Sequence, residues 1–346
     1  MTFLARSRCR AALGIFRSGG SVLALCAIAA APAAGKATIV TFDVPGAQYT
    51  NANVINDAGW IAGDYSAGGN DGYHGFLRAP DGTLTTFDPQ GSFETIPNGI
   101  NRKGTVTGFY DDNNNFVPHG FVRASKGKIL TFVGEKYTSA EAINDAGTIT
   151  GYYGEGSSLL HGFVRAANGT VTRFTAERSA ITLPHGIDAG GDVAGNYTDS
   201  SGVNHGFVRT ADGTISTFDP VGSAGTFPTA MNAGGALTGF YEQAQFDWHG
   251  FVRAPDGTIT VFDPTGSVTT GPTGINRKGE IAGYWFDANS AEHAFVRSSD
   301  GNITTFDIPH SGATEAGGIN DKGVITGVYY NDKNHSLHTH GFIRTP

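Results

Sequence analysis

The chain is poor in cysteine. Only Cys9 and Cys26 occur among its 346 residues, and both lie in a segment, residues 1–34, that is typical of a signal peptide. A basic stretch without acidic residues precedes a short apolar run at 21–34, and Ala-Pro-Ala at 31–33 offers a cleavage site. An uncleaved anchor and a lipoprotein cysteine at Cys26 are the alternatives. After cleavage the protein would have no disulfide and no thiol nucleophile, so packing alone must hold it together.

Basic residues and long apolar runs are also scarce. The formal net charge is −8, and it becomes −12 without the four arginines of residues 1–34. An acidic surface argues against nucleic acid or an anionic membrane as a partner, but it leaves cations, neutral glycans and proteins open. Beyond residue 34 no apolar run is long enough to span a membrane. We therefore expect a secreted protein, located in the periplasm, outside the cell or at the cell surface.

The motifs of common cofactor and metal sites are absent as well. The chain has no G-x-S-x-G, no H-E-x-x-H, no phosphate-binding P-loop and no dinucleotide-binding glycine motif. Residues 111–115 carry oxygen ligands at alternate positions, but Phe116 stands where a calcium loop needs glycine. We expect no cofactor and no metal site, and whether a loop binds calcium stays open.

What the chain has in abundance is glycine, with 51 residues, and a pattern that returns every 42 to 47 residues. A His-x-Phe triplet, followed by an apolar residue and an arginine, starts at His74, His119, His161, His205, His249, His293 and His340. A second phenylalanine, mostly within Thr-Phe-Asp, recurs at Phe42, Phe87, Phe132, Phe174, Phe218, Phe262 and Phe306. Repeats of about 40 to 45 residues that hold four strand-sized pieces are typical of β-propeller blades.

Each repeat reads as four antiparallel strands joined by an Asn-x-x-Gly turn, a variable loop and a tight hairpin. Residues 37–43 form a lone fourth strand, and the last repeat stops after its third. We therefore predict an all-β domain over residues 37–346, a seven-bladed β-propeller closed because the N-terminal strand completes the C-terminal blade. The predicted blades span residues 44–88, 89–132, 133–174, 175–218, 219–262, 263–306, and 307–346 together with 37–43.

The repeats resemble a known family. Residues 318–342 (GINDKGVITGVYYNDKNHSLHTHGF) and 249–266 (HGFVRAPDGTITVFDPTG) are similar to the HAF-type extracellular repeats of bacteria. The resemblance covers about residues 40–346 and implies a secreted or cell-surface protein with a β-propeller-like fold. It implies no reaction. Phe132 and Phe174 depart from the pattern, because neither is followed by aspartate.

The repeated histidines suggest a metal cage at first, but the hairpin register predicts another role. Counting outward from each hairpin places the histidine of the third strand opposite the residue that follows the second phenylalanine. The predicted pairs are His74 with Asp88, His205 with Asp219, His249 with Asp263, His293 with Asp307 and, across the closure, His340 with Asp43. His119 and His161 face Val133 and Thr175 instead. We interpret the pairs as structural, because histidines in separate blades lie too far apart to share an ion.

The innermost strand has a constant and a variable position. A threonine occurs in every copy, at Thr50, Thr95, Thr138, Thr182, Thr226, Thr270 and Thr314, and we interpret it as structural. Three residues later the side chain varies, through Asn53, Asn98, Glu141, His185, Thr229, Thr273 and Gly317. This variation indicates an asymmetric channel mouth, where the neighbouring Glu141 and His185 could act as ligand, acid or base.

The loops between second and third strands vary most, and they should lie on the face opposite the two tight turns. Their aromatic residues stand beside carboxylates and amides, which suits sugar rings or a protein partner, since variable loops on a rigid scaffold often bind ligands. The predicted ligand-binding residues are Asn53, Asn98, Glu141, His185, Thr229, Phe246, Trp248 and Tyr330.

These features predict a monomeric secreted or cell-surface module for binding or scaffolding, with a glycan or a protein at the variable-loop face and no evident catalytic machinery. The alternative is an enzyme on extracellular polysaccharide or glycoside linkages, with Glu141 and His185 at the channel mouth of the variable face. A surface protein without a small ligand is the third possibility. The fold does not choose between them, but an enzyme should show a deep pocket whose carboxylates have displaced pKa values.

Overall fold

The computed structural model describes residues 37–112, 117–132, 137–156, 159–177, 179–244, 247–331 and 338–346. The predicted signal peptide lies outside these residues. The described residues form strands and turns without a helix, so the all-β prediction is confirmed. Accordingly, none of them belongs to a helix long and apolar enough to cross a membrane.

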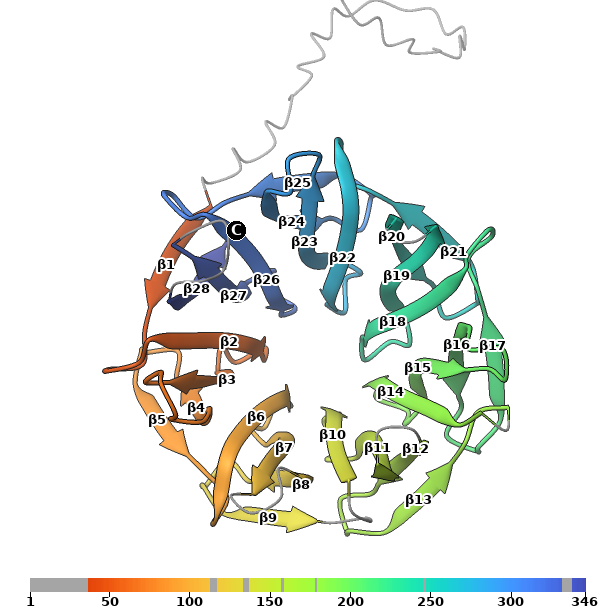
Figure 1. The fold of residues 1–346 in the computed structure, drawn as a ribbon, viewed down its shortest axis with the longest axis horizontal. Coiled ribbons are helices and arrows are strands. Elements are labelled where there is room, and N and C mark those ends of the chain that lie inside the picture. The colour runs from red at the N-terminus through yellow and green to blue at the C-terminus, as the bar shows by residue number, and fades with distance from the viewer. Residues whose placement is uncertain are drawn as a thin grey trace, which may run out of the picture. The chain divides into compact units, whose positions relative to one another are not determined.

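The strands fall into antiparallel groups of four, which we number in chain order (Figure 1). Group 1 holds β2 (Tyr49–Ile55), β3 (Ile61–Ser66), β4 (His74–Arg78) and β5 (Leu84–Phe87). Group 2 holds β6 (Ser92–Ile100), β7 (Val106–Asp112), β8 (Pro118–Arg123) and β9 (Ile129–Phe132). Group 3 holds β10 (Tyr137–Ile143), β11 (Ile149–Gly156), β12 (Leu159–Arg165) and β13 (Val171–Phe174).

The later groups repeat this order. Group 4 holds β14 (Ile181–Ile187), β15 (Val193–Thr198), β16 (Asn204–Arg209) and β17 (Ile215–Phe218). Group 5 holds β18 (Gly225–Met231), β19 (Leu237–Ala244), β20 (Asp247–Arg253) and β21 (Ile259–Phe262). Group 6 holds β22 (Ser267–Ile275), β23 (Ile281–Asp287), β24 (Glu292–Arg297) and β25 (Ile303–Phe306). Group 7 holds β26 (Ala313–Ile319), β27 (Ile325–Tyr330), β28 (Thr339–Thr345) and β1 (Thr38–Phe42).

Group 7 is built from both ends of the described chain. Strand β1 pairs antiparallel with β28, from Thr38 opposite Thr345 to Phe42 opposite Gly341. Groups 7 and 1 are also joined, because Asn320 Nδ2 donates to the carbonyl oxygen of Asn56 at 3.1 Å. Figure 1 shows the groups following one another in a circle with the first strand of each group innermost.

The turns follow from local chemistry. In the turn at residues 56–59, Asn56 Oδ1 accepts from the backbone N–H groups of Ala58 and Trp60, both at 3.0 Å. Gly59 closes the turn with φ +85°, a conformation that disfavours residues with a Cβ. The same arrangement recurs at the other Asn-x-x-Gly turns, for example at Asn101 and Asn276.

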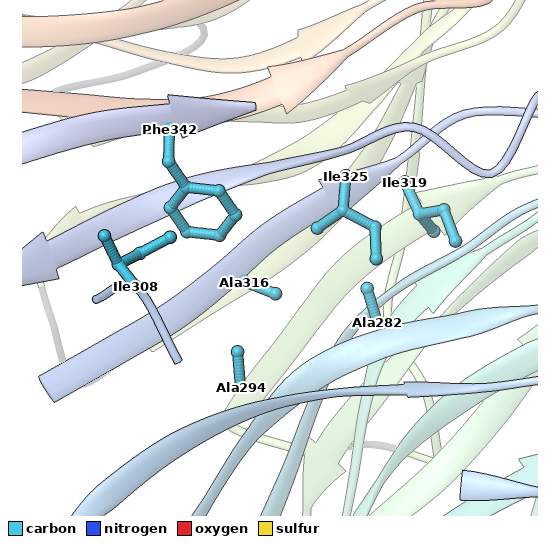
Figure 2. Packing of buried hydrophobic residues seen from close by; sticks show 7 residues of the cluster. All are labelled: Ala282, Ala294, Ile308, Ala316, Ile319, Ile325 and Phe342. Carbon is cyan, nitrogen blue, oxygen red and sulfur yellow. The ribbon is translucent and has the colours of Figure 1, made fainter. Parts of the chain in front are cut away.

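The core lies between neighbouring groups. Figure 2 shows one such cluster, in which Ala282 and Ala294 of group 6 pack against Ile325 and Phe342 of group 7. Each group contributes a buried phenylalanine from its third strand, namely Phe76, Phe121, Phe163, Phe207, Phe251, Phe295 and Phe342. The second phenylalanine of the preceding group meets this ring edge to face, as Phe87 does with Phe121 at 5.9 Å. The phenylalanines that mark the repeat are therefore interface residues.

The two kinds of tight turn share one face, as predicted. A Cβ added to Gly59 in the first turn would lie 3.5 Å from Pro80 of the β4–β5 hairpin, and one at Gly104 would lie 3.7 Å from Ser125. We call this the turn face. The loops between second and third strands and the connections between groups lie at the other ends of the same strands, on the loop face.

Candidate functional site

The structure brings the predicted histidine and aspartate partners together. In every case Nδ1 of the histidine contacts a carboxylate oxygen: His74 and Asp88 at 3.0 Å, His205 and Asp219 at 2.7 Å, His249 and Asp263 at 2.7 Å, His293 and Asp307 at 2.9 Å, and His340 and Asp43 at 2.9 Å. The last pair joins residues 297 positions apart, which is the contact that the closure argument requires.

These pairs extend into the inner strands. Thr270 Oγ1 donates to Asp263 at 2.6 Å, so a chain from His249 through Asp263 to Thr270 ties three strands together. The imidazole also packs on the ring of Tyr241, with centroids 5.4 Å apart. All of the repeated threonines are buried. This geometry describes a framework, because the imidazole Nδ1, the carboxylate and the threonine hydroxyl are bonded to one another.

Groups 2 and 3 lack the carboxylate, as the sequence indicates, but their histidines have partners. His161 Nδ1 lies 2.9 Å from the hydroxyl of Thr175. His119 Nε2 lies 3.5 Å from Asp112, an aspartate from the second strand of its own group. The predicted neighbour of His119, Val133, lies outside the described residues.

The inner strands surround a central cavity of about 300 Å³. Glu141, His185, Asn98 and Thr229 line it, while Asn53 does not. The structure corrects their expected place, because the Asn-x-x-Gly turns border this cavity and it therefore opens on the turn face. The physical reason is strand length: the variable position is the fifth residue of a seven-residue inner strand that runs from the loop face to the turn face.

Most side chains at this position bridge to the next group. Asn53, Asn98, Thr229 and Thr273 each donate to a main-chain oxygen of the following group, at 3.2, 3.2, 2.8 and 2.6 Å. The acceptor belongs to the alanine or proline that directly precedes the variable position there. Asn53 also donates to Asp64 at 2.8 Å. Asn53 and Thr229, predicted as ligand-binding, therefore have structural contacts that occupy their donors.

Glu141 and His185 depart from this pattern. Glu141 Oε1 accepts from the hydroxyl of Ser139 at 2.5 Å, and its Oε2 lies 3.4 Å from the amide of Asn98. Burial raises the pKa of Glu141 to about 7, although the Ser139 hydroxyl opposes this shift. The structure shows these partners for Glu141 and a different partner for His185, so it does not link the two as an acid–base pair.

His185 is held as a neutral ring. Its Nε2 lies 3.0 Å from Asn196 Oδ1, and the amide nitrogen of Asn196 in turn donates to Asn204. This second contact fixes the amide so that Oδ1 accepts from His185 Nε2, which leaves Nδ1 as the unprotonated nitrogen. Burial lowers the pKa of His185, against the effect of Asn196.

Charged side chains converge at the turn-face rim of the cavity. Arg102 contacts Asp57 at 2.8 Å, Asp321 at 3.6 Å and Asp145 at 3.7 Å, and so joins groups 7, 1, 2 and 3. Arg277 from group 6 reaches Asp321 at 3.7 Å and Asp145 at 4.0 Å. Burial opposes ionisation of Asp57, but the backbone N–H of Asp321 and the Arg102 guanidinium outweigh it and lower its pKa.

On the loop face, group 5 presents a stack of three aromatic rings. Phe227 of β18 stacks on Phe240 of β19 with centroids 4.9 Å apart and planes at 17°, and Phe240 stacks on Trp248 of β20 at 4.8 Å and 25°. The indole N–H of Trp248 donates to Glu242 at 2.7 Å, which fixes the outermost ring. All three rings are partly exposed. Phe246 lies outside the described residues.

Tyr330 lies at the loop-face end of β27. Burial raises its pKa, and the negative charges of Glu315 and Glu292 add to this effect. The pKa of Glu292 rises to about 8 through burial and the nearby charge of Glu315, and burial also raises that of Glu315. Tyr284 belongs to the same cluster: burial raises its pKa to about 12, and the negative charges of Glu315 and Glu292 add to this effect.

The acidic members of this cluster were missed by the sequence analysis, and so was buried Asp64, whose pKa rises to about 6. The sequence contains a pattern that could have identified Glu315 of this cluster. The residue directly after the repeated threonine differs in every copy, through Asn51, Ile96, Ser139, Leu183, Phe227, Gly271 and Glu315. This position lies two residues nearer the loop face than the one we selected, and it contributes both Phe227 and Glu315.

The chain matches no protein-family model and no curated protein. Among solved structures it is similar to a streptogramin B lyase, with 13% identity, a TM-score of 0.60 and coverage of 90% of this chain and 98% of that one. It is also similar to the β-propeller domain of the Trilobed protease from Pyrococcus furiosus, with 9% identity, a TM-score of 0.62 and coverage of 86% and 95%.

The fold is a β-propeller. A third similar structure, TolB from Acinetobacter baumannii, has a TM-score of 0.51 at 14% identity and covers 71% of this chain and 62% of that one. The Pyrococcus propeller has an open velcro topology, whereas here β1 pairs with β28. At these identities the likeness shows the fold alone, so function must be argued from the side chains.

Proposed function

We propose that this protein is a closed seven-bladed propeller that binds a neutral glycan on its loop face, as a monomeric extracellular module. Strand groups 1 to 7 are the blades. The pairing of β1 with β28, the contact between His340 and Asp43 and the bond from Asn320 to Asn56 support closure. The resemblance to HAF-type repeats and the expected signal peptide support the extracellular location.

The aromatic stack of blade 5 carries the proposal. Sugar rings have apolar C–H faces and polar edges, so they pack on aromatic rings while their hydroxyls bond to carboxylates and amides. Phe227, Phe240 and Trp248 supply such a platform, and Glu242 beside Trp248 supplies an acceptor. The rings are fixed by stacking and by the indole bond, so little side-chain freedom is lost when a ligand binds.

Charge supports a neutral ligand. The chain is acidic overall, and the carboxylate of Glu242 lies beside Trp248 of the stack. An anionic polysaccharide would meet repulsion there, whereas a neutral glycan would find hydrogen-bond acceptors.

The test is a screen of the purified protein against neutral and acidic glycans, followed by calorimetric titration with any glycan that binds. We expect a neutral oligosaccharide to bind and Trp248→Ala to weaken its affinity at least tenfold. The control is Trp60→Ala, which removes a tryptophan near the turn face and should bind like the wild type. Equal affinity of Trp248→Ala and the wild type would show that the stack is not the site.

The second candidate is an enzyme on glycosidic linkages. It is favoured by the carboxyl groups of Glu141 and Glu292, whose raised pKa values keep a large share of them protonated at neutral pH, as a general acid requires. Assaying the same glycans for new reducing ends separates the two functions. Binding without cleavage supports the module, whereas cleavage that Glu292→Gln or Glu141→Gln abolishes supports the enzyme.

A further inference from the structure

The central cavity has features that the loop-face proposal does not use. Four side chains at the variable position donate to the next blade, but Glu141 and His185, which line the cavity, do not take part in that pattern. Their chemistry is therefore available for another purpose. The cavity volume of about 300 Å³ is at the lower end of the range for small-molecule sites, roughly 300–1,000 Å³.

The carboxyl group of Glu141 determines which ligand would fit. Its hydrogen-bond partners among the described residues are the hydroxyl of Ser139 and the amide of Asn98, both neutral. The two arginine side chains in the cavity wall, Arg102 and Arg277, are engaged at the rim with aspartates. A buried carboxylate is costly unless a cation accompanies it, so a cationic ligand would be stabilised here.

His185 adds a neutral acceptor to the same wall. Because Nε2 donates to Asn196, the other ring nitrogen carries a lone pair that can accept from an N–H group. A primary ammonium has three donors, which match a carboxylate, an imidazole nitrogen and a hydroxyl or amide oxygen. The donor set of the ligand and the acceptor set of the cavity are therefore complementary.

The remainder of the wall is apolar. Between the variable position and the rim, the cavity is lined by the last hydrophobic residue of the inner strands, including Ile100, Ile143, Ile187, Met231 and Ile275. This belt favours a short hydrocarbon body attached to the cationic group, because an apolar chain gains from leaving water.

The rim indicates the entrance. The residue after the first position of each Asn-x-x-Gly turn is charged in blades 1, 2, 3, 6 and 7, where Arg102 and Arg277 pair with aspartates. In blades 4 and 5 the same position holds Ala189 and Ala233, which also line the cavity. The salt-bridge network therefore leaves these two blades uncovered, and the gap lies between Asp145 of blade 3 and Arg277 of blade 6.

We propose that the central cavity is a second binding site, specific for a small organic ammonium ion with a short apolar body. Its ammonium group pairs with Glu141 and donates to His185, its hydrocarbon part lies against the isoleucine belt, and it enters between blades 4 and 5 on the turn face. This inference concerns the face opposite the glycan site and does not rest on the proposed function.

The experiment is calorimetric titration of the purified protein with n-butylammonium chloride at pH 8.5. We expect one ion bound per chain, with no saturable heat from n-butanol or butyrate, which share the hydrocarbon but not the positive charge. Glu141→Gln should weaken binding at least tenfold, while Glu94→Gln, which changes an acid that does not line the cavity, should bind like the wild type. Binding by n-butanol at equal affinity, or unchanged binding by Glu141→Gln, would overturn the proposal.

A pH titration of the wild type tests the same claim without a variant. Lowering the pH from 8.5 to 5.5 protonates Glu141, whose pKa is about 7, so affinity for n-butylammonium should fall at least tenfold. Affinity that stays constant over this range contradicts the assignment. A further titration uses Mn²⁺. If Mn²⁺ binds in a way that requires Glu141 while n-butylammonium does not bind, the cavity is a metal site and the proposal is overturned.

The proposed entrance is tested by the association rate of the ammonium ion. Ala233→Arg places at the gap the residue that blades 2 and 6 carry at this position, and it should slow association of the ion at least fivefold. Ala211→Arg, on the neighbouring hairpin turn and outside the cavity wall, is the control and should leave the association rate unchanged. Equal rates for Ala233→Arg and the wild type would show that the ion does not enter there.

Discussion

The two ends of the innermost strands differ in kind. At the turn face an asparagine directly follows each inner strand, except in blade 4, where Asp188 does. The asparagine amides donate to the main chain of the next blade, from Asn56 through Asn320. At the loop face the inner strands carry a different residue in every blade, and two of these, Phe227 and Glu315, belong to the aromatic and acidic clusters. The position that repeats the same residue belongs to the framework. The position whose residue changes from blade to blade contributes the side chains that could select a ligand.

The single exception at the turn face explains what the asparagines do. Asp188 has no amide donor, and the contact across that interface is instead a backbone bond from Ala189 to Ala233 at 3.3 Å. Asp188 keeps the other half of the role, because its Oδ1 accepts from the backbone N–H of Asp192 at 2.8 Å. The asparagine therefore performs two separable tasks, which are to close its own turn and to join the next blade.

The largest expected effect comes from removing one such asparagine. Asn56→Ala deletes two bonds within the turn and the 2.9 Å bond to Asn101, at a position that is 5% exposed. We expect the free energy of unfolding to fall by about 3 kcal/mol, since buried backbone groups lose their partners. Chemical denaturation of the variant and the wild type measures this difference.

Asn56→Asp is the matched control, because it keeps the acceptor and replaces the amide donor with a second carboxylate oxygen, as blade 4 does naturally. It should lose about 1 kcal/mol, clearly less than the alanine variant. If both variants unfold like the wild type, the asparagines do not join the blades and the comparison between the two faces fails.

A smaller effect of opposite sign is expected at the loop face. Glu292 has a folded-state pKa of about 8, above its ordinary 4.5, so the folded protein holds a proton that the unfolded chain releases. Its contribution to stability is complete below about pH 4.5 and is lost as the pH rises through 8. At pH 9 Glu292→Gln should therefore raise the free energy of unfolding by about 2 kcal/mol, and at pH 4.5 it should change little.

Denaturant titrations at these two pH values test the expectation. Glu315→Gln provides the companion measurement, because removing its charge should lower the pKa of Glu292 and shift the loss of stability to lower pH. A Glu292→Gln variant whose stability falls between pH 4.5 and pH 9 as much as that of the wild type would contradict the proposed cause.

The repeat made much of the fold predictable. Hairpin register follows from counting residues, so the partners of His249 and His340 could be named before any coordinates were known. The four-strand reading of each repeat and the common face of the two tight turns also follow from turn chemistry. These inferences depend on local geometry that every copy repeats.

The site was less predictable, because it depends on how far along a strand a residue lies. The inner strands contain a bulge, as between Pro97 and Gly99 or Ala140 and Ala142, and the bulged residue is the variable one we selected. A bulge leaves a residue unpaired and redirects its side chain, which sequence counting does not reveal. The raised pKa values of Glu141 and Glu292 likewise depend on burial contributed by other blades.

The most direct test of the account is hydrogen–deuterium exchange at β1. If residues 38–42 complete the last blade, their backbone amides should take up deuterium as slowly as those of β21, the equivalent strand of blade 5, at residues 259–262. Exchange of residues 38–42 at the rate of an unstructured peptide, while β21 stays protected, would show that the ring is open and would contradict the closure on which the propeller account is built.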